Sequence, residues 1–116
     1  MGCWIADALA MPVHWYYNRS ALFKDYGRVT DFVAPKASHP DSIFWRSHWK
    51  TPSPELDILG EHRALWGKRG VHYHQGLSAG GNTLTVQLAS LVWEQLQEEG
   101  EYNSREYLRR YFCLCN

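Results

Sequence analysis

The 116-residue sequence lacks an excess of charge of either sign, because twelve Lys and Arg residues balance twelve Asp and Glu residues. Balanced charge argues against a basic surface, so we expect no nucleic-acid partner. The sequence also lacks an apolar run long enough to span a bilayer, since the longest, around residues 2–13, is interrupted by Asp7. That run has neither the basic start nor the cleavage site of a signal peptide. We therefore expect no membrane partner.

Cysteine is scarce as well. The three cysteines, Cys3, Cys113 and Cys115, are an odd number, and the C-x-C spacing of the last two fits neither a zinc knuckle nor a thioredoxin-like site. We interpret them as reduced thiols and expect a cytoplasmic protein. Aromatic residues, by contrast, make up 15% of the chain. With 45% apolar residues, the composition and length indicate one globular domain.

The sequence predicts an all-α fold. Three segments have the apolar spacing of α-helices, over about residues 2–10, 83–98 and 104–115. Pro12 ends the first helix, and Gly100 is a natural left-handed terminator for the second. Asn103 followed three residues later by Glu106 resembles a capping box at the start of the third.

A long irregular segment, residues 18–78, separates the first two helices. It holds every proline except Pro12 and shows little periodicity. Within it we expect short strands at 42–45 and 71–74 and a short helix at 57–66. A connection this long inside a compact domain is usually functional or disordered.

The glycine-rich segment 76–83 fits the phosphate-binding loop G-x-x-x-x-G-K-T at every position but the lysine, which is Asn82 here. Without that charge, and without a following strand that ends in Asp, a nucleotide triphosphatase is disfavoured. The alternative is a flexible loop before a helix, whose backbone N–H groups can still receive an anion.

His72 and His74 alternate, so in a strand both would face one side. Two histidines can begin a zinc site, but a third and a fourth ligand are needed. The other four histidines lie at no ligand-like spacing. We therefore favour hydrogen-bonded structural or pocket histidines over a metal site.

Asp7 lies in an apolar helix, where an unpaired carboxylate is costly to bury. Two interpretations stay open. Asp7 is either a structural acid that binds backbone or an arginine, or a carboxylate that faces a pocket with a raised pKa.

Several segments in order resemble the ADP-ribosylglycohydrolase family. Residues 2–13, GCWIADALAMPV, resemble its opening helix, typically G-x-x-x-G-D-A-x-G-x-P, and residues 79–90, AGGNTLTVQLAS, resemble the segment around its [S/T]-D-D-T motif. Residues 41–46, DSIFWR, and 70–75, GVHYHQ, are similar to stretches in one branch of the family. The resemblance extends to about Tyr111.

The resemblance implies an all-α hydrolase that removes ADP-ribose from an acceptor with the help of two Mg²⁺ ions. Magnesium prefers hard oxygen ligands, and the ions would orient the ribose and activate water. The implied partner is ADP-ribose or an ADP-ribosylated substrate. The implied pocket wall consists of Asp7, His14, Trp15, His72, His74, Asn82 and Thr83, with Asp7 as the catalytic candidate.

The sequence departs from the family at the metal motif. Gly80 and Gly81 replace the hydroxyl residue and the first carboxylate, and Asn82 replaces the second, so that Thr83 alone is retained. Asn82 is left as the single metal-ligand candidate, and the family's D-x-D-T motif would lie beyond residue 116. We therefore expect a truncated, diverged chain that binds Mg²⁺ weakly and is inactive on its own. The alternative is a non-catalytic module that binds a ligand, or a protein partner that covers the helix at 104–115.

Overall fold

The computed structural model describes residues 2–47, 50, 53 and 60–115. The described chain is all-α, and its one β-like feature is an isolated antiparallel bridge between Ser38 and Val71. The elements in order are the helices and short 3-10 turns α1 (Gly2–Ala10), η1 (Met11–Val13), α2 (Arg19–Asp25), η2 (Phe44–Arg46), η4 (Gly60–Ala64), α3 (Leu84–Glu99) and α4 (Ser104–Cys115).

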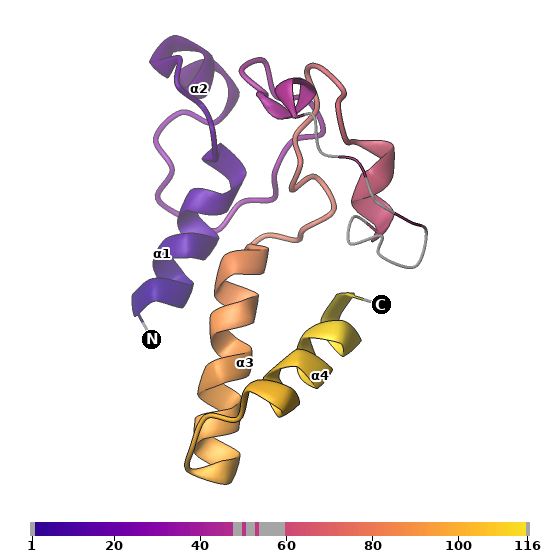
Figure 1. Ribbon diagram of the computed structural model, residues 1–116. Coiled ribbons are helices and arrows are strands. Elements are labelled where there is room, and N and C mark those ends of the chain that lie inside the picture. The colour runs from indigo at the N-terminus through magenta and orange to yellow at the C-terminus, as the bar shows by residue number, and fades with distance from the viewer. Residues whose placement is uncertain (1, 48–49, 51–52, 54–59, 116) are drawn as a thin grey trace.

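Helix α3 is the centre of the arrangement (Figure 1). The first helix, α1, packs along the N-terminal half of α3, and α4 folds back from its C-terminal end. The chain between α1 and α3, with α2, η2 and η4, gathers at the end of the molecule away from the α3–α4 turn (Figure 1). The start of α3 therefore meets both α1 and the irregular segment.

The three predicted helices are confirmed to within one residue at the ends that the structure describes. Gly100 ends α3 at φ 78°, a left-handed conformation that glycine adopts without strain. Asn103 caps α4, since its Oδ1 accepts the N–H groups of Arg105 and Glu106 at 3.0 and 3.2 Å. The reciprocal half of the predicted capping box is missing, because Glu106 binds Arg109 and Arg110 instead.

The expectation of an irregular segment from 18 to 78 is wrong at its start, where α2 forms. Asn18 caps this helix by accepting the N–H groups of Ser20 and Ala21 at 2.9 and 3.2 Å. The two expected strands are also wrong: residues 44–46 form η2, and after Val71 the chain enters turns. Of the helix expected at 57–66, residues 57–59 lie outside the described part, and Gly60–Ala64 form the 3-10 element η4.

The interior is small and polar for a chain of this length. Among the described residues, the buried apolar side chains are Ala8, Met11, Pro12, Tyr16 and Pro35. Buried polar ones outnumber them and comprise His39, Ser42, His72, His74, Thr83 and Gln95. The radius of gyration is 16.1 Å, against about 13 Å for a compact domain of this length. Much of the interior is therefore polar and needs hydrogen-bond partners.

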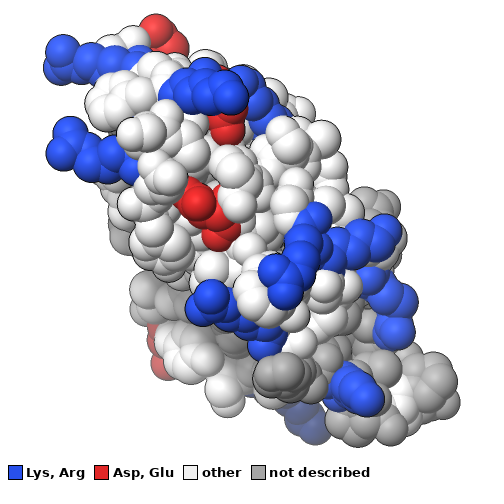
Figure 2. Space-filling view, turned by 90° about the horizontal axis from the view of Figure 1, so that it is seen from above, with Lys and Arg blue, Asp and Glu red and all other residues white. Residues whose placement is uncertain are grey.

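Charge is unevenly distributed over the surface. The face seen from the end that carries α2, η2 and η4 shows far more Lys and Arg than Asp and Glu (Figure 2). The guanidinium groups of Arg46 and Arg69 lie over the ring of Trp45, 5.0 and 3.5 Å from its centroid. Across the described helices, none is long and apolar enough to cross a membrane.

Candidate functional site

Asp7 joins α1 to the beginning of α3. Its Oδ2 accepts the backbone N–H of Thr83 at 2.7 Å, and its Oδ1 accepts the Thr83 hydroxyl at 2.8 Å. Asn82 Nδ2 donates to the same Oδ2 at 3.1 Å and to the carbonyl of Trp4 at 2.7 Å. A carboxylate at this position satisfies an unpaired N–H group of α3 and suits the positive end of the helix dipole.

The pKa of Asp7 is lowered. Partial burial alone would raise it, but the hydrogen bonds from Thr83 and Asn82, with the nearby His14, outweigh that effect. Of the two interpretations from the sequence, the hydrogen bonds to Thr83 fit the structural acid, and the lowered pKa does not fit the carboxylate with a raised pKa. The sequence alone could not decide between the two interpretations, because the hydrogen-bond donors, Asn82 and Thr83, lie 75 and 76 positions farther along the chain.

Two fully buried histidines brace the chain around η1. His72 Nε2 donates to the carbonyl of Pro12 at 2.9 Å, and its Nδ1 accepts the N–H of His74 at 3.1 Å. His39 repeats this arrangement, donating to the carbonyl of His14 at 2.6 Å and accepting the N–H of Asp41 at 3.1 Å. Both ring nitrogens of each imidazole are thus engaged, and burial lowers the pKa of His72.

His14 and His74 form a second pair beside them. His14 Nδ1 and His74 Nε2 are 3.1 Å apart, so one nitrogen donates and the other accepts. Burial lowers the pKa of His14, although the charge of Asp7 opposes the shift. Burial, with the neighbouring His14 and His72, lowers the pKa of His74 to about 4. Both rings are therefore neutral at pH 7.

A cavity of about 380 Å³ opens beside this pair. It is lined by His14, Trp15, Phe44, Tyr73, His74, Thr83, Leu84 and Thr85. The rings of Phe44 and Tyr73 stack with centroids 4.3 Å apart, and Trp15 meets Phe44 edge-on at 4.6 Å. Three aromatic rings, two neutral imidazoles and the first turn of α3 thus surround one space of the size usual for small-molecule sites.

Trp15 is the one non-glycine residue with positive φ in the described chain, at 63°. Such a backbone conformation costs a tryptophan on the order of 1–3 kcal/mol and persists only where surrounding contacts impose it. Here Trp15 stacks on His74 with centroids 5.4 Å apart and packs against Phe44. These contacts therefore hold both the strained backbone of Trp15 and its indole in the cavity wall.

The structure brings together most of the pocket wall expected from the sequence. His14, Trp15, His74 and Thr83 line the cavity, and Asp7 and Asn82 support Thr83 from behind. The prediction that His72 and His74 share one face is wrong: residues 73–76 turn, so His72 is directed to Pro12 while His74 reaches the cavity.

Sequence reasoning missed four lining residues, Phe44, Tyr73, Leu84 and Thr85. Phe44 lies in the 41–46 stretch that carried the family resemblance, which is a signal that could have found it. Tyr73 stands between the two histidines, and the assumed strand placed it on the opposite face.

The residues at the start of α3 do not fit a magnesium ion. Both oxygens of Asp7 already accept hydrogen bonds, and Asn82 directs its amide nitrogen, a donor, towards Asp7. Gly80 and Gly81 offer no side-chain oxygen, whereas Mg²⁺ requires several hard oxygen ligands in octahedral geometry. Over the described residues, no three His, Cys, Asp or Glu side chains are arranged to hold a metal ion.

Cys3 and Cys113 do not line this cavity. Cys3 and Cys113 are free thiols at the surface, on α1 and α4.

No protein-family model, curated protein or solved structure matches the chain. Any functional conclusion therefore rests on the residues and their geometry.

Proposed function

We propose that the chain is an ADP-ribosylglycohydrolase-like protein that binds ADP-ribose, free or attached to an acceptor, without hydrolysing it. The observation that carries the proposal is the cavity between Trp15, Tyr73, His74 and the first turn of α3. Its walls offer what a nucleotide sugar needs: flat rings for a base, polar groups for the ribose, and a helix start for phosphate.

The aromatic wall suits a nucleobase. Stacking between a base and an aromatic side chain contributes about 1–3 kcal/mol per base in nucleic-acid complexes. The cavity presents the rings of Trp15, Phe44 and Tyr73, and no charged side chain lies among its lining residues. The rings therefore offer flat faces on which a base can stack.

The opposite wall suits an anion. Thr83, Leu84 and Thr85 place the N-terminal turn of a sixteen-residue helix at the cavity. Asp7 already accepts the N–H and the hydroxyl of Thr83, so the groups that remain for a phosphate are the backbone N–H groups of Leu84 and Thr85 and the exposed Thr85 hydroxyl.

Hydrolysis is not expected from this arrangement. The carboxylate that the family resemblance suggests as catalytic, Asp7, accepts three hydrogen bonds from Thr83 and Asn82. With its lowered pKa it is a poor general acid, and its position behind Thr83 keeps it off the cavity wall. Binding without turnover is the function that these contacts favour.

Calorimetric titration with ADP-ribose tests the proposal. We expect saturable binding at one site in the absence of Mg²⁺, weakened roughly fivefold to hundredfold by Trp15→Asn, in line with the loss of one stacking ring. Asparagine tolerates positive φ, so this variant removes the ring without adding backbone strain. The matched control, Trp93→Leu, removes an indole far from the cavity and should bind normally. Equal weakening in both variants, or no saturable heat from the parent chain, would refute the proposal.

A second candidate function is docking to a protein partner through α4. Leu108 and Phe112, one turn apart on this helix, are 52% and 60% exposed. A large exposed apolar stripe above a small core is typical of an interaction face. We expect the isolated chain to bind an apolar-surface dye and to self-associate. The double replacement Leu108→Lys and Phe112→Lys should abolish both effects, and a monomer that binds no dye would contradict this candidate.

A further inference from the structure

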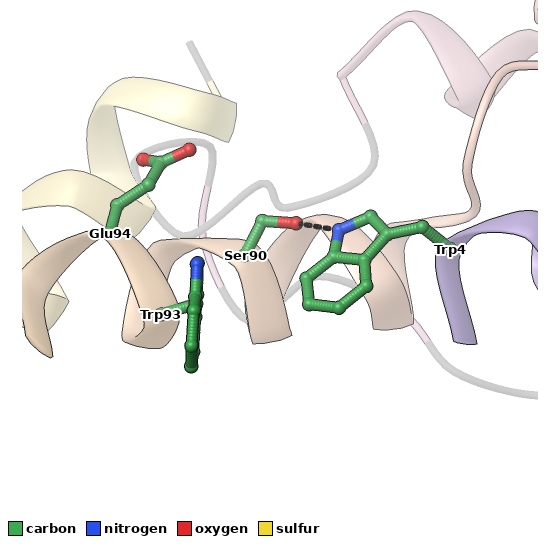
Figure 3. A pocket seen from close by; sticks show the side chains of 4 residues that line it. All are labelled: Trp4, Ser90, Trp93 and Glu94. Carbon is green, nitrogen blue, oxygen red and sulfur yellow. Dashed lines mark hydrogen bonds between the residues drawn. The ribbon is translucent and has the colours of Figure 1, made fainter. Parts of the chain in front are cut away.

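A separate pocket lies between α1 and α3, away from the cavity at the start of α3. It has a volume of about 310 Å³ and is lined by Trp4, Ser90, Trp93 and Glu94. Ser90, Trp93 and Glu94 stand at positions i, i+3 and i+4 of α3 and therefore share one face of the helix. Figure 3 shows Ser90 in the middle, with Trp4 on one side and Trp93 and Glu94 on the other.

The two indoles are held differently. Trp4 Nε1 donates to the Ser90 hydroxyl at 2.7 Å, and Ser90 in turn donates to the Val86 carbonyl at 3.0 Å, so the Trp4 ring is fixed. Trp93 is 54% exposed. The pocket therefore presents one anchored and one exposed aromatic ring.

Glu94 supplies the charge of this pocket. Arg110 of α4 binds Glu98 and Glu99, and Arg109 binds Glu106. No cation among the described residues lies within ion-pair distance of the Glu94 carboxylate. The pocket thus combines two electron-rich rings with an uncompensated negative charge.

We propose that this pocket binds the alkylammonium group of a lysine side chain presented by a partner protein. Indole faces attract cations, most strongly among the aromatic side chains, and their apolar edges pack against the methylene stem. Glu94, the one charged residue that lines the pocket, favours the charged ligand over a neutral one of the same shape. The volume has room for the stem as well as the ammonium group, and for this reason we favour a side chain over a small free cation.

The test uses the full chain with 5-fluorotryptophan in place of tryptophan, followed by fluorine NMR, with resonances assigned by single Trp→Phe replacements. The probe is N-acetyl-lysine methylamide, and its neutral counterpart is N-acetyl-norleucine methylamide. We expect the lysine derivative to shift the resonances of Trp4 and Trp93 saturably and to leave that of Trp15 unchanged. We expect the norleucine derivative to bind less tightly.

Two charge-matched variants separate the pocket from general electrostatics. Glu94→Gln should weaken binding about twofold to fivefold, as loss of one exposed ion pair does. Glu101→Gln removes the same charge from an exposed position after α3 and should change nothing. Trp93→Leu, a replacement at an exposed position, should weaken binding about twofold to fivefold through loss of the cation–π contact.

Three outcomes would overturn the proposal. Equal affinity for the lysine and norleucine derivatives would make the pocket a purely apolar one. Equal effects of Glu94→Gln and Glu101→Gln would show a diffuse charge effect. Tighter binding of tetramethylammonium than of the lysine derivative would assign the pocket to a free quaternary ammonium ligand instead of a protein side chain.

Discussion

The carboxylate of Asp7 caps helix α3 by accepting the backbone N–H of Thr83 at 2.7 Å, across 76 positions of sequence. The same carboxylate also accepts the Thr83 hydroxyl and the Asn82 amide. One side chain of α1 thereby fixes the beginning of α3, and with it the wall of the cavity that Thr83, Leu84 and Thr85 form.

Replacing Asp7 by Ala should lower the free energy of unfolding by about 1–3 kcal/mol, because a charged cap and its hydrogen bonds are lost. Urea unfolding measures the change. Asp31→Ala, at an exposed position whose carboxylate accepts only the Thr30 hydroxyl among the described hydrogen bonds, should cost less than about 0.5 kcal/mol. Similar losses in the two variants would mean that the cap contributes nothing of its own.

The histidine cluster should make the protein acid-sensitive. The pKa values of His14, His72 and His74 are lowered in the folded state, mainly by burial. Between the folded and unfolded pKa values the unfolded chain binds more protons, so stability is complete above about pH 6.5 and falls as the pH drops. For His74, with a folded pKa of about 4, the loss down to pH 4 is on the order of 3 kcal/mol.

Urea midpoints between pH 7.5 and 4.5 check this expectation. His74→Gln should be less stable than the parent chain at pH 7.5 and show a shallower decline. A parent chain whose stability stays level or rises between pH 7 and pH 5 would contradict the neutral cluster.

The helices were predictable because their signals are local. The spacing of Leu84, Leu88 and Leu91 and the terminator Gly100 act within a few turns of one helix, and the structure follows them. The capping signal of α2 is equally local, since Asn18 directly precedes Arg19–Asp25. This helix was missed because the prolines farther along led us to treat all of residues 18–78 as irregular.

The site was predictable only in part, because its contacts are long-range. Asp7 and Thr83 could be named from the sequence, but the bond between them depends on how the chain returns after the irregular segment. Tyr73 reaches the cavity because His72 is tied to the carbonyl of Pro12 and the chain turns after it. The spacing of apolar and polar residues in 71–77 does not predict the hydrogen bond between His72 and Pro12.

Asn82→Asp should create a response to Mg²⁺ that we do not expect of the parent chain. The amide that donates to Trp4 and Asp7 would become a carboxylate facing a carbonyl and a second carboxylate. Without metal we expect a loss of about 1–4 kcal/mol from the lost donors and the repulsion. Added Mg²⁺ should restore stability by bridging the two carboxylates.

Thermal unfolding with and without millimolar Mg²⁺ measures this response. The parent chain and Asn82→Ala should show no shift, and calorimetry should give the parent an affinity for Mg²⁺ no tighter than millimolar. Micromolar affinity in the parent would show that the start of α3 holds metal after all.

Gln95→Leu should loosen α4. The Gln95 side chain is fully buried, accepts the N–H of Asn103 at 3.0 Å and donates to its carbonyl at 3.1 Å. Loss of this pair should destabilise the turn by about 1–3 kcal/mol and speed hydrogen exchange of amides in α4. Gln97→Leu, at an exposed position of α3, is the control. Unchanged exchange in α4 would show that other contacts hold it.

The most direct measurement of binding without hydrolysis is a time course with an ADP-ribosylated peptide in millimolar Mg²⁺, in which free ADP-ribose is quantified by mass spectrometry and the complex by size. We expect a one-to-one complex that persists, with no more ADP-ribose released than in a protein-free control. Release that grows with time and with protein concentration would contradict the account and make the chain an active hydrolase.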